Sequence, residues 1–250
     1  MTQDVLLRRG HGFFGLGLAV VVLSALLAGI PLVAYLALLS SVTLFALAYV
    51  NYFKCDTLKG KRWQPALALG LSLLAVALTV VAYVGVPDAL QARDPEGLVA
   101  AIKRHYVITT GTLTLSAAAW FLVGTAREPG PRIKGLLTAA LVIALMNGLL
   151  ALVYIAPNME ARLREDFQSP EGLRAFNAST DANETASFYL NSTRDAFQPY
   201  SALRDLGDML PRLLAVGAFY LLWDQERRRP LPGREEEGVV DVSDAFKPQS

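Results

Sequence analysis

The chain has 250 residues, of which 53% are hydrophobic and only 18% are charged, and its formal net charge is +1. A soluble domain carries about 25% charged residues, whereas here long uncharged windows alternate with short charged segments. This pattern is typical of a protein that crosses a membrane several times. The small net charge gives no support to nucleic-acid binding, and a single cysteine excludes an internal disulfide and a cysteine-cluster metal site.

The first apolar run covers residues 13–53 and contains no charged side chain. A single helix of that length would be about 60 Å long, roughly twice the thickness of a hydrocarbon core. Gly29 and Pro31 are placed to interrupt it, because glycine loosens a helix and proline removes a backbone donor. We therefore predict two spans, at residues 13–31 and 32–53, in preference to one span followed by a re-entrant segment.

Four further apolar segments follow along the chain. We predict spans at residues 65–86, 106–126, 135–156 and 206–223. The last span is short, and we expect Pro211 to lie in an early turn, where proline is tolerated. The predicted fold class is therefore all-α: a polytopic membrane protein with about six transmembrane helices, arranged as three helical hairpins. The only long loop, at residues 157–205, is expected to be helical and extracytoplasmic.

The domain organisation and the orientation follow from the charged segments. We assign residues 1–12 to a polar N-terminus, residues 13–226 to the membrane domain and residues 227–250 to a disordered tail. In membrane proteins, lysine and arginine concentrate in the short loops that lie on the cytoplasmic side of the membrane. In this chain they concentrate in the N-terminus, residues 54–64, residues 127–134 and the start of the tail. We therefore predict an integral protein of the cell membrane, with both termini cytoplasmic.

A Pro-Glu-Gly-Leu phrase occurs twice, at residues 95–98 and 170–173, each time after an apolar span that reaches a proline. Pro95 and Pro170 suit the first position of a helix, and the glutamates that follow suit its positive end. We predict a short helix on the outer membrane surface at each copy. The phrase indicates a helical hairpin repeat, with chance resemblance between membrane hairpins as the alternative.

Polar side chains within the predicted spans are the first candidates for a functional role. Thr109, Thr112 and Ser116 recur at helical spacing in the fourth span, and Asn147 lies in the fifth. Hydroxyl groups in membrane helices commonly bond back to carbonyls of their own helix, and small polar residues support helix packing. The same four residues could instead line a path for a small uncharged solute.

The long loop contains three acceptor sequences for N-glycosylation, at Asn177, Asn183 and Asn191. They fall on the side that the charge distribution places outside the cell, so the protein is a candidate glycoprotein. A loop rich in serine and threonine also produces such sequences by chance. In a bacterial host they would carry no meaning.

No pattern in the chain indicates an enzyme. The sequence contains no nucleophile elbow, phosphate-binding loop or zinc motif. We therefore assign no catalytic, cofactor-binding or metal-binding residue, and no cofactor. The predicted span cores also contain no charged residue, because Arg212 is placed at the outer edge of the last span. Ion coupling through buried carboxylates is accordingly not expected.

These observations favour a non-enzymatic accessory or scaffolding subunit of a membrane. Its partners would be the lipid bilayer and a protein that contacts loop 157–205, since exposed loops commonly carry binding surfaces. The alternative is a transporter or channel for a small uncharged solute that works without carboxylate-based ion coupling.

Overall fold

The computed structural model describes residues 3–27, 31–54, 63–91, 95–126, 129–170, 174 and 191–228. All regular secondary structure in these ranges is helical, and six helices are long and apolar enough to cross a membrane. The predicted fold class, an all-α polytopic membrane protein with about six spans, is confirmed. The predicted tail is outside the described residues apart from its first two positions.

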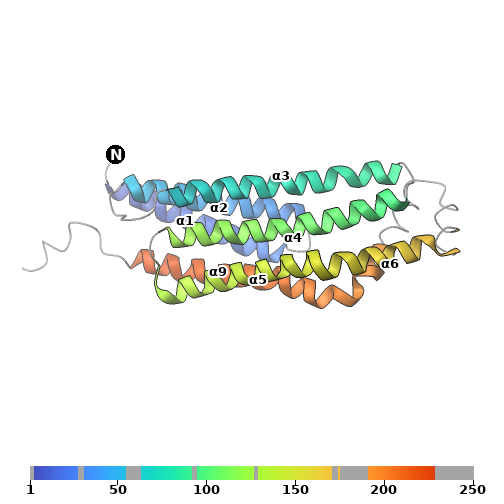
Figure 1. The fold of residues 1–250 in the computed structure, drawn as a ribbon. Coiled ribbons are helices and arrows are strands. Elements are labelled where there is room, and N and C mark those ends of the chain that lie inside the picture. The colour runs from blue at the N-terminus through green and yellow to red at the C-terminus, as the bar shows by residue number, and fades with distance from the viewer. Residues whose placement is uncertain are drawn as a thin grey trace, which may run out of the picture.

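The helices follow one another in chain order. They are α1 (Gln3–Leu26), α2 (Pro31–Lys54), α3 (Trp63–Gln91), α4 (Pro95–Thr125), α5 (Pro131–Leu150), the π-helical turn η1 (Ala151–Ile155), α6 (Ala156–Gln168), the 3-10 turn η2 (Gln198–Tyr200) and α9 (Ser201–Arg227). Residues 191–197 are helical as well. In Figure 1, α1 begins and α9 ends at the same end of the bundle, which we call the terminal end. The opposite end, where α6 lies, is called the loop end.

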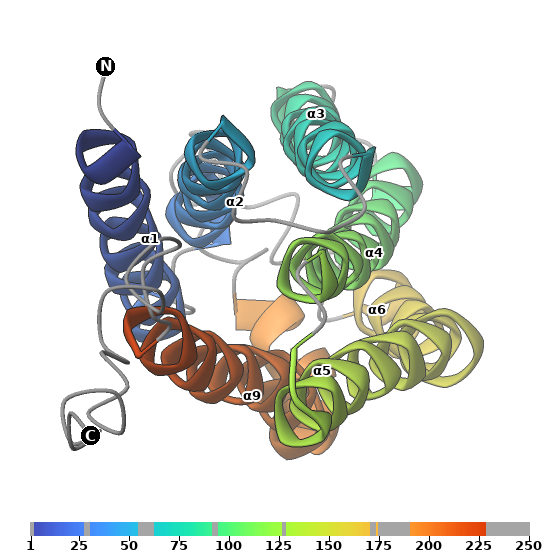
Figure 2. The same cartoon turned by 90° about the vertical axis from the view of Figure 1, so that its left-hand side faces the viewer.

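The long helices form a closed ring when the bundle is viewed along its axis. Each helix contacts the next one in the order α1, α2, α3, α4, α5 and α9, and α9 contacts α1 to close the ring (Figure 2). α4 also contacts α2 and α9, so it lies closer to the centre than its neighbours. A side chain that points inwards from α9 therefore faces helices that are distant in the sequence.

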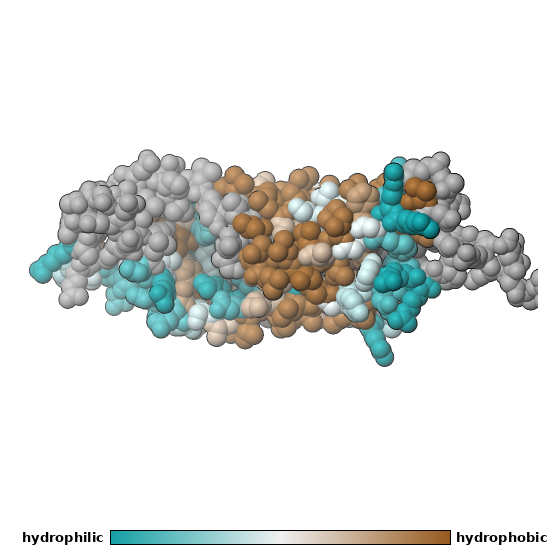
Figure 3. All heavy atoms as spheres, turned by 180° about the vertical axis from the view of Figure 1, so that it is seen from behind, coloured by the Kyte–Doolittle hydropathy of each residue, from teal (hydrophilic) through white to brown (hydrophobic). Residues whose placement is uncertain are grey.

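The surface is divided into three zones along the bundle axis. Figure 3 shows a broad hydrophobic band in the middle of the visible face, with hydrophilic residues toward both ends. Exposed side chains of the fifth span change from apolar at Leu152 and Val153 to polar at Asn158 and Arg162. Such a band matches the hydrocarbon core of a bilayer, which is about 30 Å thick.

The spans are longer than predicted because their prolines do not end them. α3 continues through Pro87, and α5, η1 and α6 form one uninterrupted helical segment through Pro157. At Pro157 the π-helical turn explains the continuity. The Ala156 N–H bonds to the Ala151 carbonyl, and Pro157 is the second residue of α6, in the first turn, where proline is tolerated. The loop expected at residues 87–105 is consequently helical, apart from residues 92–94, which are outside the described part.

Two further expectations about proline positions are corrected in the same way. Pro211 lies in the interior of α9, ten residues after the helix begins at Ser201, and not in an early turn. The first Pro-Glu-Gly-Leu copy does start a helix at Pro95, with Glu96 in its first turn. That helix is α4 itself and not a short surface helix, since Leu98 is buried in its continuous packing with α6. Most of the second copy, at residues 171–173, is outside the described part, so the hairpin repeat stays a prediction.

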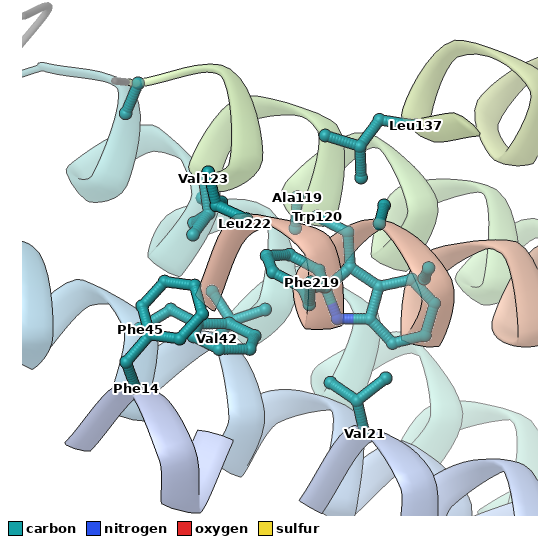
Figure 4. Packing of buried hydrophobic residues seen from close by; sticks show 14 of the residues in the cluster. Phe14, Val21, Val42, Phe45, Ala119, Trp120, Val123, Leu137, Phe219 and Leu222 are labelled. Atoms are coloured by element: carbon teal, nitrogen blue, oxygen red, sulfur yellow. The ribbon is translucent and has the colours of Figure 1, made fainter. Parts of the chain in front are cut away.

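The terminal half of the bundle is held by what we call the aromatic cluster: Phe14, Phe45, Tyr49, Trp120 and Phe219. The Phe45 and Phe219 rings stack with centroids 4.2 Å apart, and Phe14 lies 4.9 Å from Phe45 (Figure 4). The Trp120 Nε1–H donates to the Ser41 Oγ at 3.3 Å. These contacts join α1, α2, α4 and α9, which are far apart in the sequence.

Candidate functional site

α9 carries a charged side chain that is almost completely buried. Arg212 is only 2% exposed. It lies between apolar residues that face outwards, with Leu206 64% exposed and Leu213 52% exposed. Exposed apolar residues continue along α9 to Leu221, about 22 Å from Leu206 along the axis. Arg212 is therefore inside the hydrophobic band and directed away from its surface.

The position of Arg212 overturns the expectation that the spans contain no charged residue. The predicted core of the last span began at residue 213 and left Arg212 at the outer edge. α9 instead runs from Ser201 to Arg227, so Asp208 and Arg212 are both inside the helix. The strictly apolar window was too narrow, because a helix that is part of a bundle can carry polar residues on its inner face.

The Arg212 guanidinium has few compensating contacts. Its Nε and Nη1 atoms are buried without a hydrogen-bond partner, and in the described part of the chain no carboxylate lies within 4.0 Å of it. Asp208, one turn earlier, is near enough to interact with it electrostatically. Asp224 and Arg228 have the same spacing near the end of α9, and there the ion pair forms at 2.9 Å. The two Asp–Arg pairs have the same spacing in the sequence, but the exposed pair forms an ion pair and the pair with the buried Arg212 does not.

Asn147 on α5 packs against α9 in the same part of the bundle. It is 5% exposed, and its side-chain amide contacts Gly207 so closely that a methyl group at that glycine would collide with it. Within the described residues its Nδ2 has no hydrogen-bond partner. Because Pro211 has no N–H, the Gly207 carbonyl also lacks the usual helical donor four residues later. Unused hydrogen-bonding groups thus occur on both sides of this helix contact.

The hydroxyl groups that the sequence singled out on α4 are already bonded. Thr109 donates to the His105 carbonyl at 2.8 Å, Thr112 to the Thr109 carbonyl at 2.6 Å, and Ser116 to the Thr112 carbonyl at 2.8 Å. These bonds agree with the interpretation that the residues serve their own helix, and they leave less hydrogen-bonding capacity for a solute path.

A neighbouring hydroxyl connects two helices. The Thr114 Oγ1 donates to the Ala144 carbonyl on α5 at 3.0 Å and lies beside Gly148. Asn147 belongs to the same stretch of α5. Thr114, Asn147 and Gly207 therefore extend across the α4–α5–α9 contact. Of these three, only Asn147 was chosen from the sequence as a candidate site residue.

The loop end contains a second cluster, which we call the α4–α6 seam. Its apolar members, from the outer turns of α4 and from α6, are Leu98, Val99, Ile102, Met159, Leu163 and Phe167. The Lys103 Nζ donates to the Glu160 Oε2 at 2.6 Å. Glu160 lies beyond the apolar surface of the bundle, and the hydrogen bond from Lys103 lowers the pKa of its carboxyl below the ordinary value. Arg164 also pairs with Glu160, at 3.1 Å.

The candidate glycosylation residues are only partly covered by the structure. Asn177 and Asn183 are outside the described residues. Asn191 is exposed at the beginning of helical residues 191–197. Its side chain is accessible, and use of the acceptor stays a prediction.

No group of three or more potential metal ligands occurs among the described residues. Comparison with protein-family models, curated proteins and solved structures finds no match. A function for this chain must therefore be argued from its own geometry.

Proposed function

We propose that the protein is a non-enzymatic accessory or scaffolding subunit of a membrane, and that it presents its loop end to a protein partner. The observation that carries this proposal is the length of the helical segment from Pro131 to Gln168, which has 38 residues. Such a segment extends about 57 Å, whereas a hydrocarbon core is about 30 Å thick. Well over 20 Å of it would stand outside a bilayer.

The packing of the projecting part supports a role in recognition. The α4–α6 seam buries Leu163 and Phe167 against α4, and the Lys103–Glu160 pair joins the two helices beside it. The side of α6 that faces away from the seam exposes charges of both signs, including Arg162 and Glu165. A preorganised helix with mixed charges suits a protein surface of complementary charge, because less conformational freedom is lost on binding.

Site-specific photo-crosslinking tests the proposal. A photo-reactive amino acid at Glu165, on the exposed face of α6, should form a discrete covalent adduct with one partner protein in intact cells. The matched control is the same amino acid at Leu152, which is exposed within the apolar band and should react with lipid. A crosslink pattern at residue 165 that is as diffuse as the one at residue 152 would refute a specific partner at this surface.

We also propose that the terminal end faces the cytoplasm of the cell. The support is the concentration of lysine and arginine near that end. Cys55 is the single cysteine of the chain and lies in the basic segment after α2. A membrane-impermeant maleimide should label it only after the cells are opened. Efficient labelling in intact cells would reverse the orientation and place the loop end inside.

The alternative, a transporter or channel, is favoured by one observation. Arg212 and Asn147 carry buried donors without partners in the interior of the helix ring. Their chemistry suits an anionic group better than the uncharged solute expected from the sequence. Solute flux through the purified protein in liposomes, without any added subunit, would favour this function over the accessory role.

A further inference from the structure

Arg212 presents an unusual balance of charge and burial. Placing a guanidinium in an apolar environment costs several kcal/mol unless a counter-charge and hydrogen bonds compensate it. Here the residue is 2% exposed, and two of the three guanidinium nitrogen atoms have no hydrogen-bond partner. Within the described part of the chain, no ion pair shorter than 4.0 Å and no hydrogen bond to Nε or Nη1 offsets this cost.

The nearest acidic residue does not fully satisfy Arg212. Asp208 interacts with it electrostatically, but Asp208 also interacts with Arg204, and the two residues of α9 do not form an ion pair within 4.0 Å. The Asp224–Arg228 pair shows that this spacing permits a 2.9 Å contact on the same helix. Arg212 is therefore directed to a position where Asp208 does not reach it.

The unpartnered atoms of Arg212 are all hydrogen-bond donors, because the Nε and Nη1 atoms belong to a guanidinium group that has no acceptor. Guanidinium N–H groups bind the oxygen atoms of carboxylates and phosphates, and arginine can do so with two parallel hydrogen bonds. These unused donors therefore define the chemistry of the missing group.

We propose that Arg212 binds an oxyanion in the interior of the helix ring, on the inner side of α9. The anion is a carboxylate or phosphate group, carried either by a lipid headgroup or by a water-soluble molecule. Its negative charge supplies the counter-ion that the protein does not provide. This binding site is independent of the partner surface at the loop end.

Thermal unfolding of the full-length protein in nanodiscs tests the proposal and separates the two sources of the anion. A ligand that binds only the native state raises Tm. In the lipid arm, discs of phosphatidylcholine are compared with discs that also contain phosphatidylglycerol. In the solute arm, phosphatidylcholine discs receive inorganic phosphate or acetate at constant ionic strength. We expect Tm to rise in at least one arm.

Substitutions assign the effect to Arg212. Arg212→Gln should abolish the rise in Tm, and Arg212→Lys, which keeps the charge but loses the fork of donors, should reduce it. Arg228→Gln, at the exposed C-cap of the same helix, should leave it unchanged. If Arg212→Gln does not fold, Arg212→Lys provides the same comparison, with a smaller rise than the unmodified protein.

Asp208→Asn provides an independent check, because it removes the acidic neighbour that competes for Arg212. We expect a larger anion-dependent rise in Tm for this variant than for the unmodified protein. No rise for the unmodified protein in either arm, or an equal rise in the Arg212 and Arg228 variants, would overturn the proposal. In that case the guanidinium is held by the protein alone.

Discussion

Around Phe45 and Phe219 the helices meet through stacked rings, whereas at the loop end α4 and α6 meet through aliphatic side chains beside an ion pair. The aromatic cluster lies in the terminal half of the bundle, where lipid would surround the helices. Ion pairs there would lose their hydration without gaining much, since desolvation can exceed the Coulombic attraction. The α4–α6 seam lies beyond the apolar surface, where water reduces that cost.

The comparison explains why Arg212 stands out. It lies between the aromatic cluster and the α4–α6 seam, at a depth that neither the stacked rings nor the ion pairs reach. The aromatic cluster contributes no acceptor at this position, and the ion pairs of the α4–α6 seam are further toward the loop end. A charged group in this intermediate zone is a candidate for function because its cost in stability is not recovered by the fold.

The largest expected effect comes from opening the aromatic cluster. Phe219→Ala removes a fully buried ring that stacks on Phe45, and the free energy of unfolding should fall by about 3–5 kcal/mol. Tyr220 is the next residue and is 56% exposed, so Tyr220→Ala should change stability by less than about 0.5 kcal/mol. Unfolding by SDS titration in mixed micelles measures both. Similar losses for the two variants would contradict the packing described for α9.

Truncation in the α4–α6 seam should have a more local result. Leu163 is completely buried against α4, and Leu163→Ala should destabilise the seam by about 2–4 kcal/mol. Because this seam is outside the band, we expect faster amide hydrogen exchange in residues 156–168 with little change around Phe219. Glu165→Ala, on the exposed side of α6, is the control. Uniformly faster exchange in both regions would show that the two halves unfold together.

The membrane fold could be predicted from the sequence, but the ends of the helices could not. Uncharged windows between charged segments identify six spans because a bilayer admits little else. Pro87 and Pro157 were interpreted as helix ends, although a long helix can continue past a proline when a π-helical turn or neighbouring helices accommodate it. α3 and α6 both pack against α4 beyond these prolines, and a single sequence does not show such contacts.

Arg212 was missed for a related reason. A strictly apolar window ended the last span at residue 213, whereas Leu203, Leu206, Leu210 and Leu213 recur at helical spacing on the outward side of α9. That periodicity, which passes over Asp208 and Arg212, was the available signal. Asn147 could be selected because an amide within an apolar run is conspicuous. Its contact with Gly207 depends on the packing of α5 against α9.

Two glycines test how tightly the aromatic cluster is packed. A Cβ at Gly17 would lie 2.7 Å from the Phe45 ring, which is fixed by stacking on Phe219. Gly17→Ala should therefore destabilise the protein by about 1–3 kcal/mol. At Gly70 on α3 a Cβ meets nothing within 4 Å, and Gly70→Ala should stabilise the helix by about 0.5–1 kcal/mol. Thermal unfolding in micelles should show shifts of opposite sign, and shifts of the same sign would argue against close packing at Gly17.

The smallest expected effect concerns the ion pair at the loop end. Glu160 has its pKa lowered from the ordinary value of 4.5, mainly by the hydrogen bond from Lys103. A carboxyl whose pKa is lower in the folded protein contributes stability above its unfolded pKa. That contribution is lost as the pH falls through the folded pKa. Part of the stability of the α4–α6 seam should therefore disappear in acid, below the ordinary pKa of glutamate.

Lys103→Met tests this contribution directly. The pair is partly exposed, so the variant should lose only about 0.2–1 kcal/mol at neutral pH. Its stability should also change less than that of the unmodified protein between neutral pH and the acid range, because Glu160 keeps only its pair with Arg164. Arg104→Met removes an adjacent exposed charge and serves as the control. Parallel pH profiles for the two variants would mean that the aliphatic contacts of Leu163 and Phe167, and not the ion pair, hold α6 against α4.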